Sequence, residues 1–571
     1  MEFSVLGLND NAHVSLNTCE KNGIVYVDIK MTLDDESIPE KFKVRWSFPD
    51  TDCYSTWSPS LKADRFLAPN WRKRKTESRL ASWMPVQTLI SMSGQNRLCI
   101  ALSDTKTPVS IATGIREETA AFDCDVEFFT VPTAAIKEYS ATLRLDTRDI
   151  PYYDSIYDVT RWWEEDCGYS PAYVPEHARL PMNSLWYSFH QQLDPDEIIR
   201  QCKLSKPLGM DTVIIDDGWQ TDDNNRGYAY CGDWEVTPTK FPDMREFVDR
   251  VHAEGMKVML WYSVPYIGVH SKAYQKFHDM LLDSSGKEWF CADPRFKEVR
   301  GFLTETYVNA VQSWGLDGLK LDFIDAFKLN GKSLEYDPRR DYTSLEDAID
   351  ALMNEVTAAL REINPEILIE FRQSYIGPTI RKYGNMLRVG DCPNDAIRNR
   401  CAVVDMRLTS GNTPVHSDML MWNYGDTVES AALQFANILY SVPQISMLID
   451  RLSDEHFKML RYYLSFWREH RKILLDGRLT ATNPESCYGI VRADLDMRAV
   501  ITLYNETMVE NVGKYAAVVN ASRSGTVYVK DCAGREYEIV SCTGKKLQSG
   551  VFGSEGISAV NVPMCGILFV K

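Results

Sequence analysis

Short apolar runs and amphipathic segments alternate between residues 182 and 472. The runs have the length and composition of buried strands, and the segments, such as 196–209 and 345–363, repeat apolar residues at helical spacing. Eight strand-then-helix units in about 290 residues match the size of a (β/α)8 barrel, although a doubly wound sheet also alternates. We therefore predict a barrel with strands at 184–189, 211–216, 257–263, 318–323, 367–372, 386–390, 413–418 and 444–449.

Both flanks of this region have the pattern of antiparallel β structure. Alternating runs such as 139–147 precede it and others such as 498–505 follow it, with turn residues between them. A chain of 571 residues is also too long for one hydrophobic core. The predicted fold class is α/β, with an N-terminal β-sandwich and connector (1–175), a central catalytic (β/α)8 TIM barrel (176–472) and a small C-terminal antiparallel β-sandwich (473–571).

Composition and charge narrow the range of partners. The net charge of −17 argues against nucleic acid or an anionic membrane as a partner. No run of about 18 apolar residues is present, and the N-terminus lacks the basic-then-apolar pattern of a secretory signal. The 14 cysteines are scattered without metal-ligand spacing, and no Gly-rich phosphate loop is found. We predict a cytoplasmic protein without metal or organic cofactor; a homo-oligomer is left open.

Ionisable and aromatic residues stand at the ends of most of the predicted strands. In a barrel of this kind the chemistry takes place where strands end and loops begin. One such residue alone is more often a helix cap, as expected for Asp395, but a whole rim of them is hard to explain that way. The residues are Asp216, Asp217, Trp219, Trp261, Lys320, Asp322, Glu370, Arg372, Arg388, Asp391, His416 and Asp418.

Lys320 and Asp322 lie two residues apart on one predicted strand, so their side chains point to the same side. A lysine in this position can hydrogen-bond a sugar hydroxyl, and it favours the ionised form of Asp322. An ionised carboxylate beside an anomeric carbon is a nucleophile, and a second carboxylic acid then protonates the leaving oxygen. Asp391 is the candidate for that acid. A purely structural ion pair is the alternative.

Four motifs resemble glycoside hydrolase family 36, the α-galactosidase and raffinose-synthase family. They are VIIDDGWQ, GDW with KFPDM, GMKVMLWYSVP and GLDGLKLDFID, in the order that the family shows. The resemblance covers the barrel and extends to the flanking β domains. It implies a retaining, exo-acting α-glycosidase that hydrolyses terminal α-galactosyl residues of short oligosaccharides by double displacement.

The resemblance also implies roles for individual residues. Asp322 matches the nucleophile, and LRVGDCPNDA resembles the acid/base segment, which makes Asp391 the general acid/base with Arg388 nearby. Asp216, Asp217 and Lys320 match residues that hydrogen-bond the sugar hydroxyls, and Trp261 matches an aromatic wall. Three further residues, Trp186, His190 and Trp219, are candidates for the pocket lining, although core packing is equally expected for Trp186.

One segment departs from the family pattern. IEFRQSYIGP (369–378) stands where many α-galactosidases have a stretch rich in Cys or Ser and Gly, so the identity of the sugar is open. Arg372 is expected either to contact an anionic group or to pair with Glu370 or Asp391, and the pairing is the simpler expectation. Three alternatives remain: a raffinose synthase-like transferase, another donor (an α-N-acetylgalactosaminide, a β-L-arabinopyranoside or a charged sugar), and a non-catalytic sugar-binding protein.

Overall fold

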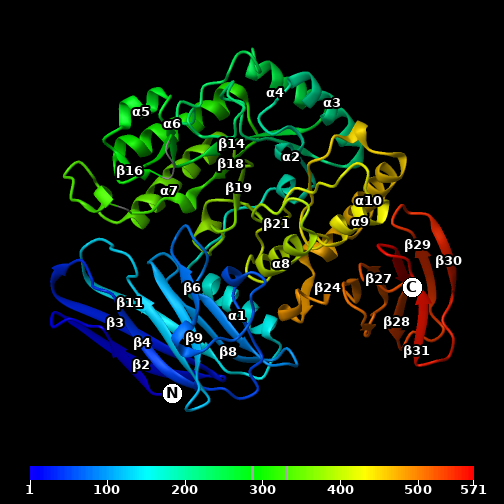
Figure 1. Cartoon of the computed structure of the whole chain (residues 1–571), viewed down its shortest axis with the longest axis horizontal. Helices are drawn as coiled ribbons and strands as arrows, with labels where there is room; N and C mark the ends of the chain where they lie inside the picture. The colour runs from blue at the N-terminus through cyan, green and yellow to red at the C-terminus, as the bar shows by residue number, and fades with distance from the viewer. Residues whose placement is uncertain (285–287, 330) are drawn as a thin grey trace.

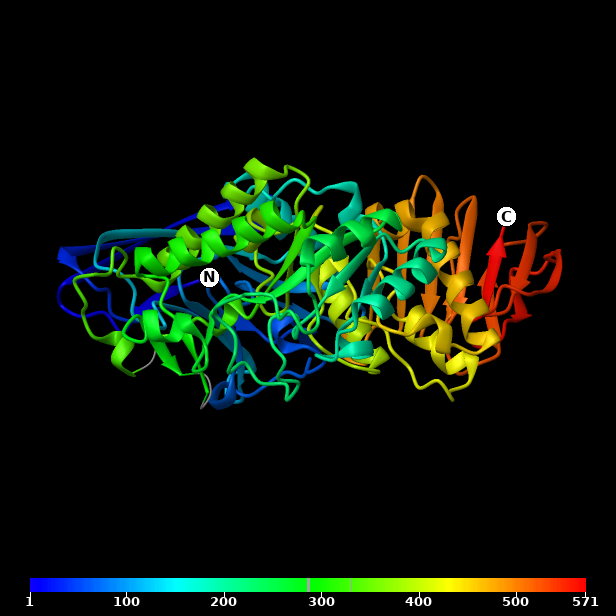
Figure 2. The ribbon, with the colours of Figure 1, turned by 90° about the horizontal axis from the view of Figure 1, so that it is seen from above.

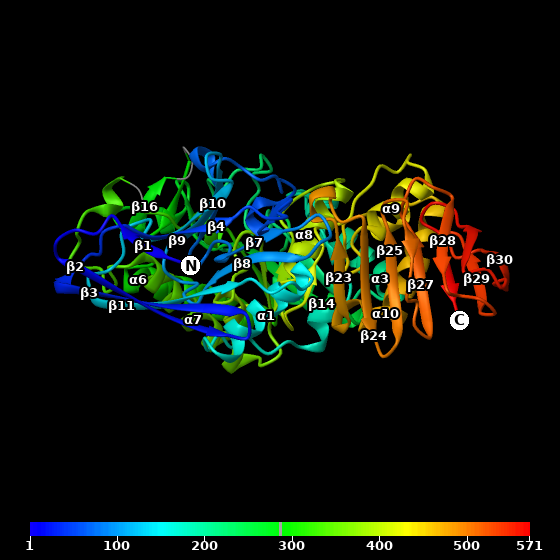
Figure 3. The same ribbon diagram turned by 90° about the horizontal axis from the view of Figure 1, so that it is seen from below.

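A computed structural model of the chain describes residues 1–284, 288–329 and 331–571. The molecule is elongated, with the barrel above a β domain at the N-terminal end and a second β domain at the C-terminal end (Figure 1). Figure 2 shows the helices of the barrel from above, and Figure 3 shows both β domains from below. No helix in these ranges is long and apolar enough to cross a membrane.

The N-terminal domain is a sandwich of two antiparallel sheets. Their orders are β1-β4-β10-β9-β6 and β2-β3-β11-β8-β7-β5. Inward-facing residues such as Val27, Ile29 and Met31 alternate with exposed ones along the strands and fill the space between the sheets. The strands are β1 Phe3–Leu6, β2 Ala12–Lys21, β3 Ile24–Ser37, β4 Phe42–Pro49, β5 Ser55–Trp57, β6 Arg74–Ser78, β7 Val86–Ile90, β8 Asn96–Leu102, β9 Val109–Arg116, β10 Ala121–Phe128 and β11 Ile136–Asp146.

Eight parallel strands form the nearly closed barrel that the sequence predicts. They follow one another in chain order, and a bridge between His416 and Val442 brings the last strand next to the seventh. Most lie inside the predicted runs, and 257–263 matches in full. The strands are β12 Met182–Ser184, β13 Thr212–Ile215, β14 Lys257–Ser263, β18 Gly318–Asp322, β19 Leu368–Arg372, β20 Met386–Arg388, β21 Val415–His416 and β22 Gln444–Ile445.

The first predicted strand, 184–189, is largely wrong. The strand β12 ends at Ser184, and the helical turn α2 (Trp186–Phe189) follows. The hydroxyl of Ser446 accepts hydrogen bonds from the backbone N–H groups of Tyr187 and Ser188, both at 3.1 Å, which satisfies donors at the start of this turn. Periodicity cannot distinguish a short apolar strand from a buried helical turn.

Helices surround the barrel, and side-chain caps explain where several begin. Asp194, Asp243 and Ser344 each accept a backbone N–H in the first turn of the helix that follows. A small sheet of β15 (Tyr266–Gly268), β16 (Leu281–Ser284) and β17 (Trp289–Ala292) lies between β14 and β18 in the chain. The helices are α3 Pro195–Ser205, α4 Met244–Ala253, α5 Lys272–Phe277, α6 Lys297–Trp314, α7 Leu345–Ile363, α8 Ala396–Arg407, α9 Val428–Ala436 and α10 Asp454–Asp476.

The C-terminal domain has a seven-stranded sheet, β23-β24-β25-β27-β32-β29-β30, and a three-stranded sheet, β26-β28-β31. The proposed boundary at 472/473 falls inside α10, and the proposed connector before 176 contains a helix, α1 (Tyr152–Glu165). The strands are β23 Arg478–Thr482, β24 Ile490–Leu495, β25 Arg498–Leu503, β26 Met508–Val509, β27 Tyr515–Asn520, β28 Thr526–Lys530, β29 Glu536–Val540, β30 Lys546–Val551, β31 Ile557–Asn561 and β32 Ile567–Val570.

A buried carboxylate joins the three parts of the chain. Asp405 of α8 accepts hydrogen bonds from Trp57 (3.0 Å) and Arg65 (2.6 Å) of the N-terminal domain and from Tyr488 of the C-terminal domain. The Arg65 and Asp405 side chains are each about 1% exposed. These contacts hold the N-terminal domain against the end of the barrel where the strands deliver their polar residues.

Candidate active site

The parallel register brings the predicted site residues to one rim. Trp261 of β14 lies opposite Lys320 of β18, and Arg372 of β19 lies opposite Arg388 of β20. Asp322 is the last residue of β18. In a barrel this carboxyl end of the strands is the face that carries the chemistry.

Four donors converge on the carboxylate of Asp322. Trp261 Nε1 donates to Oδ2 at 2.9 Å. Arg372 Nε, Tyr375 Oη and the backbone N–H of Phe323 donate to Oδ1 at 2.6, 2.7 and 2.7 Å. Phe323 has a positive φ of 65°, so the backbone turns sharply after the strand and aims its N–H at the carboxylate. Asp322 is therefore held in one orientation at the strand end.

The surroundings of Asp322 favour its ionised form. Burial by itself would raise the pKa of this carboxyl, because a charge is disfavoured away from water. The positive charges of Arg372 and Lys320 and the hydrogen bond from Trp261 outweigh that effect and hold the pKa well below its usual range. The expected pairing of Arg372 with Glu370 or Asp391 is corrected here: Arg372 pairs with Asp322.

Lys320 forms its ion pair with Asp216. Its Nζ donates to Oδ2 of Asp216 at 2.6 Å, and both side chains are about 5% exposed or less. The alternative of a direct Lys320–Asp322 ion pair is not what forms; Lys320 acts on Asp322 through its charge. The two residues come from β18 and from the loop after β13, with β14 between them. The pair therefore bridges β18 and the loop after β13 across β14, the strand that carries Trp261.

Asp217 is held by two glutamines. Gln191 Nε2 donates to Oδ2 and Gln220 Nε2 donates to Oδ1, both at 2.7 Å. Burial raises the pKa of Asp217 to about 6, and the nearby charge of Asp216 acts in the same direction. The Gln191 contact links the loop after β12 to the loop after β13, a contact that local sequence patterns do not reveal.

Aromatic rings form one side of the site. Tyr228 stacks against Trp261 at 6.2 Å between ring centroids, and Phe323 meets Trp261 edge-on at 6.3 Å. Trp219 has no exposed surface, and its indole N–H donates to the carbonyl of Trp261 at 2.9 Å. Trp219 thus supports the wall from behind and does not face the site.

Trp186 and His190 form a separate, partly exposed cluster with Arg226. The two rings meet edge-on at 4.9 Å, and Arg226 Nη2 lies 2.8 Å from His190 Nε2. Burial and the cation of Arg226 lower the pKa of His190. His190 is therefore neutral at neutral pH and can accept or donate a hydrogen bond without carrying charge.

Arg388 is the most heavily paired cation of the rim. Its Nη1 donates to Asp418 at 2.6 Å, its Nη2 donates to Asp391 at 2.9 Å, and its Nε lies 3.5 Å from Glu370. The guanidinium is about 1% exposed. Asp418 is also buried and accepts a hydrogen bond from the hydroxyl of Tyr187 at 2.9 Å. It therefore positions Arg388 and does not face the site.

Asp391 is the exposed member of this network. Its side chain is 53% exposed, whereas those of Arg388, Glu370 and Asp418 are buried. Although about half of the Asp391 side chain is exposed, the surrounding protein limits its hydration and would by itself raise the pKa; the charge of Arg388 outweighs that effect and lowers the pKa. Without a substrate this carboxyl is ionised at neutral pH. A general acid must be protonated, so the Arg388 contact has to weaken before Asp391 can act in that role.

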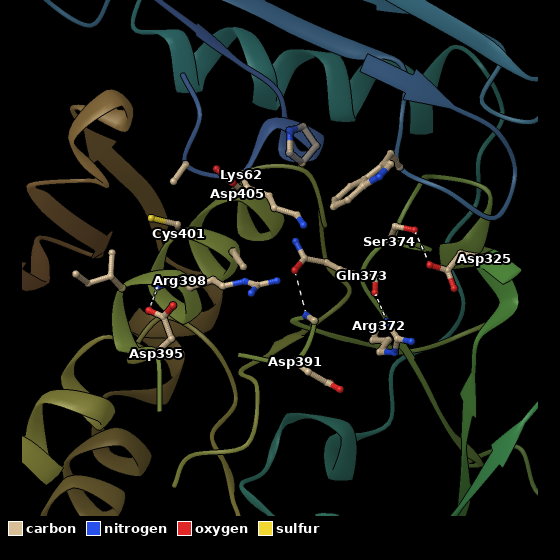
Figure 4. Close-up of a pocket in the computed structure, with 16 residues that line it drawn as sticks. Lys62, Asp325, Arg372, Gln373, Ser374, Asp391, Asp395, Arg398, Cys401 and Asp405 are labelled. Carbon is tan, nitrogen blue, oxygen red and sulfur yellow. Dashed lines mark hydrogen bonds between the residues drawn. The ribbon is translucent and has the colours of Figure 1, made fainter. Parts of the chain in front are cut away.

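A cavity of about 940 Å³ opens beside Asp391 and Arg372, between the barrel and the N-terminal domain (Figure 4). Trp83 and Lys62 of the N-terminal domain also line it. Trp83 is fastened to the barrel because its backbone N–H donates to the carbonyl of Ser374 at 2.7 Å. Arg79 adds two hydrogen bonds to barrel carbonyls, of Phe327 at 2.6 Å and of Asp325 at 2.8 Å.

The contribution of the N-terminal domain is what sequence analysis missed. Nothing in the pattern around Lys62 or Trp83 marks a site, because these residues reach the barrel only through tertiary packing. The structure also decides what two residues singled out in the sequence, Asp395 and His416, do. Asp395 is a helix cap, accepting the backbone N–H of Arg398 at 3.0 Å, and His416 is fully buried against the carbonyl of Ala178.

Residues 173–370 match the family model for Melibiase. The α-galactosidase Mel36A of Lactobacillus acidophilus is 30% identical over 146 residues, 24% of this chain and 20% of that protein. The bifunctional α-galactosidase/sucrose kinase AgaSK of Mediterraneibacter gnavus is 30% identical over 239 residues, 40% of this chain and 24% of that protein. The chain thus spans about a quarter or less of the length of these curated relatives.

Solved structures share the fold along nearly the whole chain. The galactosidase domain of AgaSK has a TM-score of 0.66 and 14% identity, covering 98% of this chain and 80% of that one. The GH36 α-galactosidase AgaA from Geobacillus stearothermophilus, in complex with stachyose, has a TM-score of 0.67 and 14% identity, covering 98% and 81%. At this identity the likeness concerns the fold, a barrel with flanking β domains. The Melibiase match, the α-galactosidase relatives and the shared fold together support the assignment of this chain to glycoside hydrolase family 36.

Proposed function

We propose that this protein is a retaining, exo-acting α-galactosidase that hydrolyses terminal α-galactosyl residues of short oligosaccharides. The observation that carries the proposal is the Asp322 carboxylate at the end of β18, which is held ionised and fixed by Trp261, Arg372 and Tyr375. The relatives named α-galactosidases and the stachyose bound by AgaA support galactose as the donor sugar.

The proposed reaction has two steps. Asp322 attacks the anomeric carbon while protonated Asp391 gives its proton to the leaving oxygen, which forms a covalent glycosyl-enzyme. Asp391 then takes a proton from water, and the resulting nucleophile releases the sugar and restores Asp322. Retaining enzymes hold the two carboxyl groups about 5–5.5 Å apart. Trp261, Asp216, Asp217 and Lys320 would hold the sugar in front of Asp322.

The network around Arg388 provides a way for Asp391 to change protonation state. Arg388 also contacts Asp418 and lies near Glu370, both buried. Its charge therefore stays compensated when Asp391 becomes neutral or turns away toward a leaving group. A substrate that displaces water from the exposed side of Asp391 would raise the pKa of Asp391 in the direction that a general acid needs.

We also propose a cytoplasmic location. Its support is in the sequence: the 14 cysteines are scattered along the chain without the spacing of a disulfide framework, as is usual for proteins of a reducing compartment.

The test is turnover of 4-nitrophenyl α- and β-glycosides, including the α-galactoside, the α-N-acetylgalactosaminide and the β-L-arabinopyranoside. We expect turnover of the α-galactoside that is lost in Asp322→Ala and partly restored by azide as a β-galactosyl azide. The matched control is Asp35→Ala, at an exposed aspartate of β3. Full activity of Asp322→Ala would refute the nucleophile, and turnover of another glycoside alone would refute galactose as the donor.

A further inference from the structure

Two cationic side chains, Lys62 and Arg398, point into the cavity beside Asp391 (Figure 4). They come from different parts of the chain, Lys62 from the N-terminal domain and Arg398 from the first turn of α8. Within residues 1–284, 288–329 and 331–571, neither side chain forms an ion pair. Their donors are therefore available to a bound molecule.

The acidic groups of the same cavity are already engaged. Asp391 is bound by Arg388 at 2.9 Å, and Asp405 by Arg65 at 2.6 Å. Asp395 caps α8, and Asp325 accepts the hydroxyl of Ser374 at 2.9 Å. The third cation of the lining, Arg372, is engaged as well, through its 2.6 Å contact with Asp322. Asp391 and Asp405 thus have cationic partners, and Asp325 and Asp395 are held by neutral donors. Lys62 and Arg398 are the two cations of the lining that no carboxylate in the described part of the chain pairs with directly.

The cavity lies on the side of the site where a leaving group would be. Asp391, the proposed proton donor to the leaving oxygen, lines it together with Arg372 of the barrel and Trp83 of the N-terminal domain. A ring of this kind is a stacking surface for a flat sugar face. With a volume of about 940 Å³ the cavity has room for more than a small aglycone.

We propose that this cavity binds the leaving group as an acidic saccharide, whose carboxylate or phosphate pairs with Lys62 and Arg398 while its ring lies on Trp83. The inference rests on the proposed function, and it adds the chemical class of the leaving group. An arginine fork and a lysine are the side chains that recognise carboxylates and phosphates, the first by geometry and the second as a point charge.

The test compares three α-galactosides joined through the same hydroxyl: one of galactose, one of galacturonate, and one of galactose phosphorylated on its primary hydroxyl. We expect kcat/KM to be about tenfold higher for at least one acidic leaving group than for the neutral one, the size expected of one charge-assisted hydrogen bond. The arm with the larger ratio identifies carboxylate or phosphate. The ratio should fall at high salt because the cations are solvent-exposed.

The variants Lys62→Gln and Arg398→Gln remove each charge and leave a polar, uncharged amide on a shorter side chain. Each is expected to lower the acidic-to-neutral ratio severalfold, and the double variant to bring it to about one. Lys514→Gln, at an exposed lysine of the C-terminal domain outside the cavity, is the matched control and should leave the ratio unchanged. A wild-type ratio of one or less, or a ratio that survives the double variant, would overturn the inference.

Failure of the two proposals can be told apart. Turnover of 4-nitrophenyl α-galactoside without a preference for acidic leaving groups would refute this inference and leave the proposed α-galactosidase activity standing. If that galactoside is not turned over, calorimetric binding of free galacturonate and of galactose phosphate to the wild type and to the double variant decides the inference. Binding that is weakened by the double variant supports it; equal binding, or none, overturns it.

Discussion

Arg372 Nε lies 2.6 Å from Oδ1 of Asp322, so a cation from β19 binds the carboxylate at the end of the neighbouring strand. The two oxygens of Asp322 are thereby made unequal. Oδ1 accepts three hydrogen bonds, whereas Oδ2 accepts one, from Trp261. Oδ2 has the lone pair left for an anomeric carbon, and we expect it to be the attacking atom.

Replacing Arg372 by glutamine should move the acidic limb of kcat/KM to higher pH. Arg372 lowers the pKa of Asp322, so its loss raises that pKa, by about one to three units for one adjacent charge. The measurement is the pH profile with 4-nitrophenyl α-galactoside. Tyr375→Phe, which removes a hydrogen bond to the same oxygen and no charge, is the comparison and should move the limb less. An unmoved limb in Arg372→Gln would contradict this account.

Asp391→Ala should lower kcat/KM most for substrates whose leaving groups need protonation to depart. General acid catalysis typically contributes about 10²–10⁴-fold, so we expect a loss of that order with a sugar leaving group and a much smaller one with 2,4-dinitrophenol. Steady-state kinetics on both substrates gives the comparison. Equal losses on the two would exclude Asp391 as the acid. Asp243→Ala, which removes the cap of α4 outside this cavity, provides the control.

Lys320→Met should destabilise the barrel strongly. It leaves the carboxylate of Asp216 buried without its partner, a change that typically costs about 3–5 kcal/mol. The double variant Lys320→Met with Asp216→Leu should recover much of that loss, because no buried charge remains, while turnover stays absent. Denaturant unfolding of the two variants measures the difference. If the double variant is no more stable than the single one, the loss of stability comes from packing and not from the unpaired charge.

The stability contributed by Asp217 should fall as the pH rises from about 4 to 6. Its pKa is raised to about 6 in the folded state, above the ordinary value near 4, so the folded state holds the proton more tightly than the unfolded state. The contribution is complete below pH 4 and is lost as the pH rises through 6. Calorimetric melting of the wild type and Asp217→Asn across this range should show the melting temperature of the wild type falling relative to that of the variant as the pH rises. Parallel curves would argue against the raised pKa.

The barrel could be predicted from the sequence because its strands are short apolar runs whose boundaries are marked by Gly, Asp and Pro. The strand 257–263 and the helix 345–363 match in full. The strand predicted at 184–189 failed for a physical reason. Its apolar residues are buried as a helical turn whose N–H groups are satisfied by Ser446, about 260 residues away in the chain.

Only part of the candidate site could be predicted from the sequence. The strand ends place Trp261, Asp322 and Arg388 on one rim, and that much follows from position alone. The pairing did not follow: Lys320 binds Asp216, and Arg372 binds Asp322. Such pairings depend on side-chain rotamers across three strands, which spacing along the chain does not fix. The wall that includes Trp83 depends on the docking of a whole domain.

Asp405 carries a consequence for how the molecule comes apart. Side chains of both β domains bind its buried carboxylate, and it also lines the cavity. Departure of the N-terminal domain would leave the carboxylate of Asp405 without its cation, Arg65, and departure of the C-terminal domain would remove the hydrogen bond from Tyr488, so either opening is costly. The three parts should therefore melt together in one cooperative transition, and a barrel expressed alone would lose both that anchor and one side of the cavity.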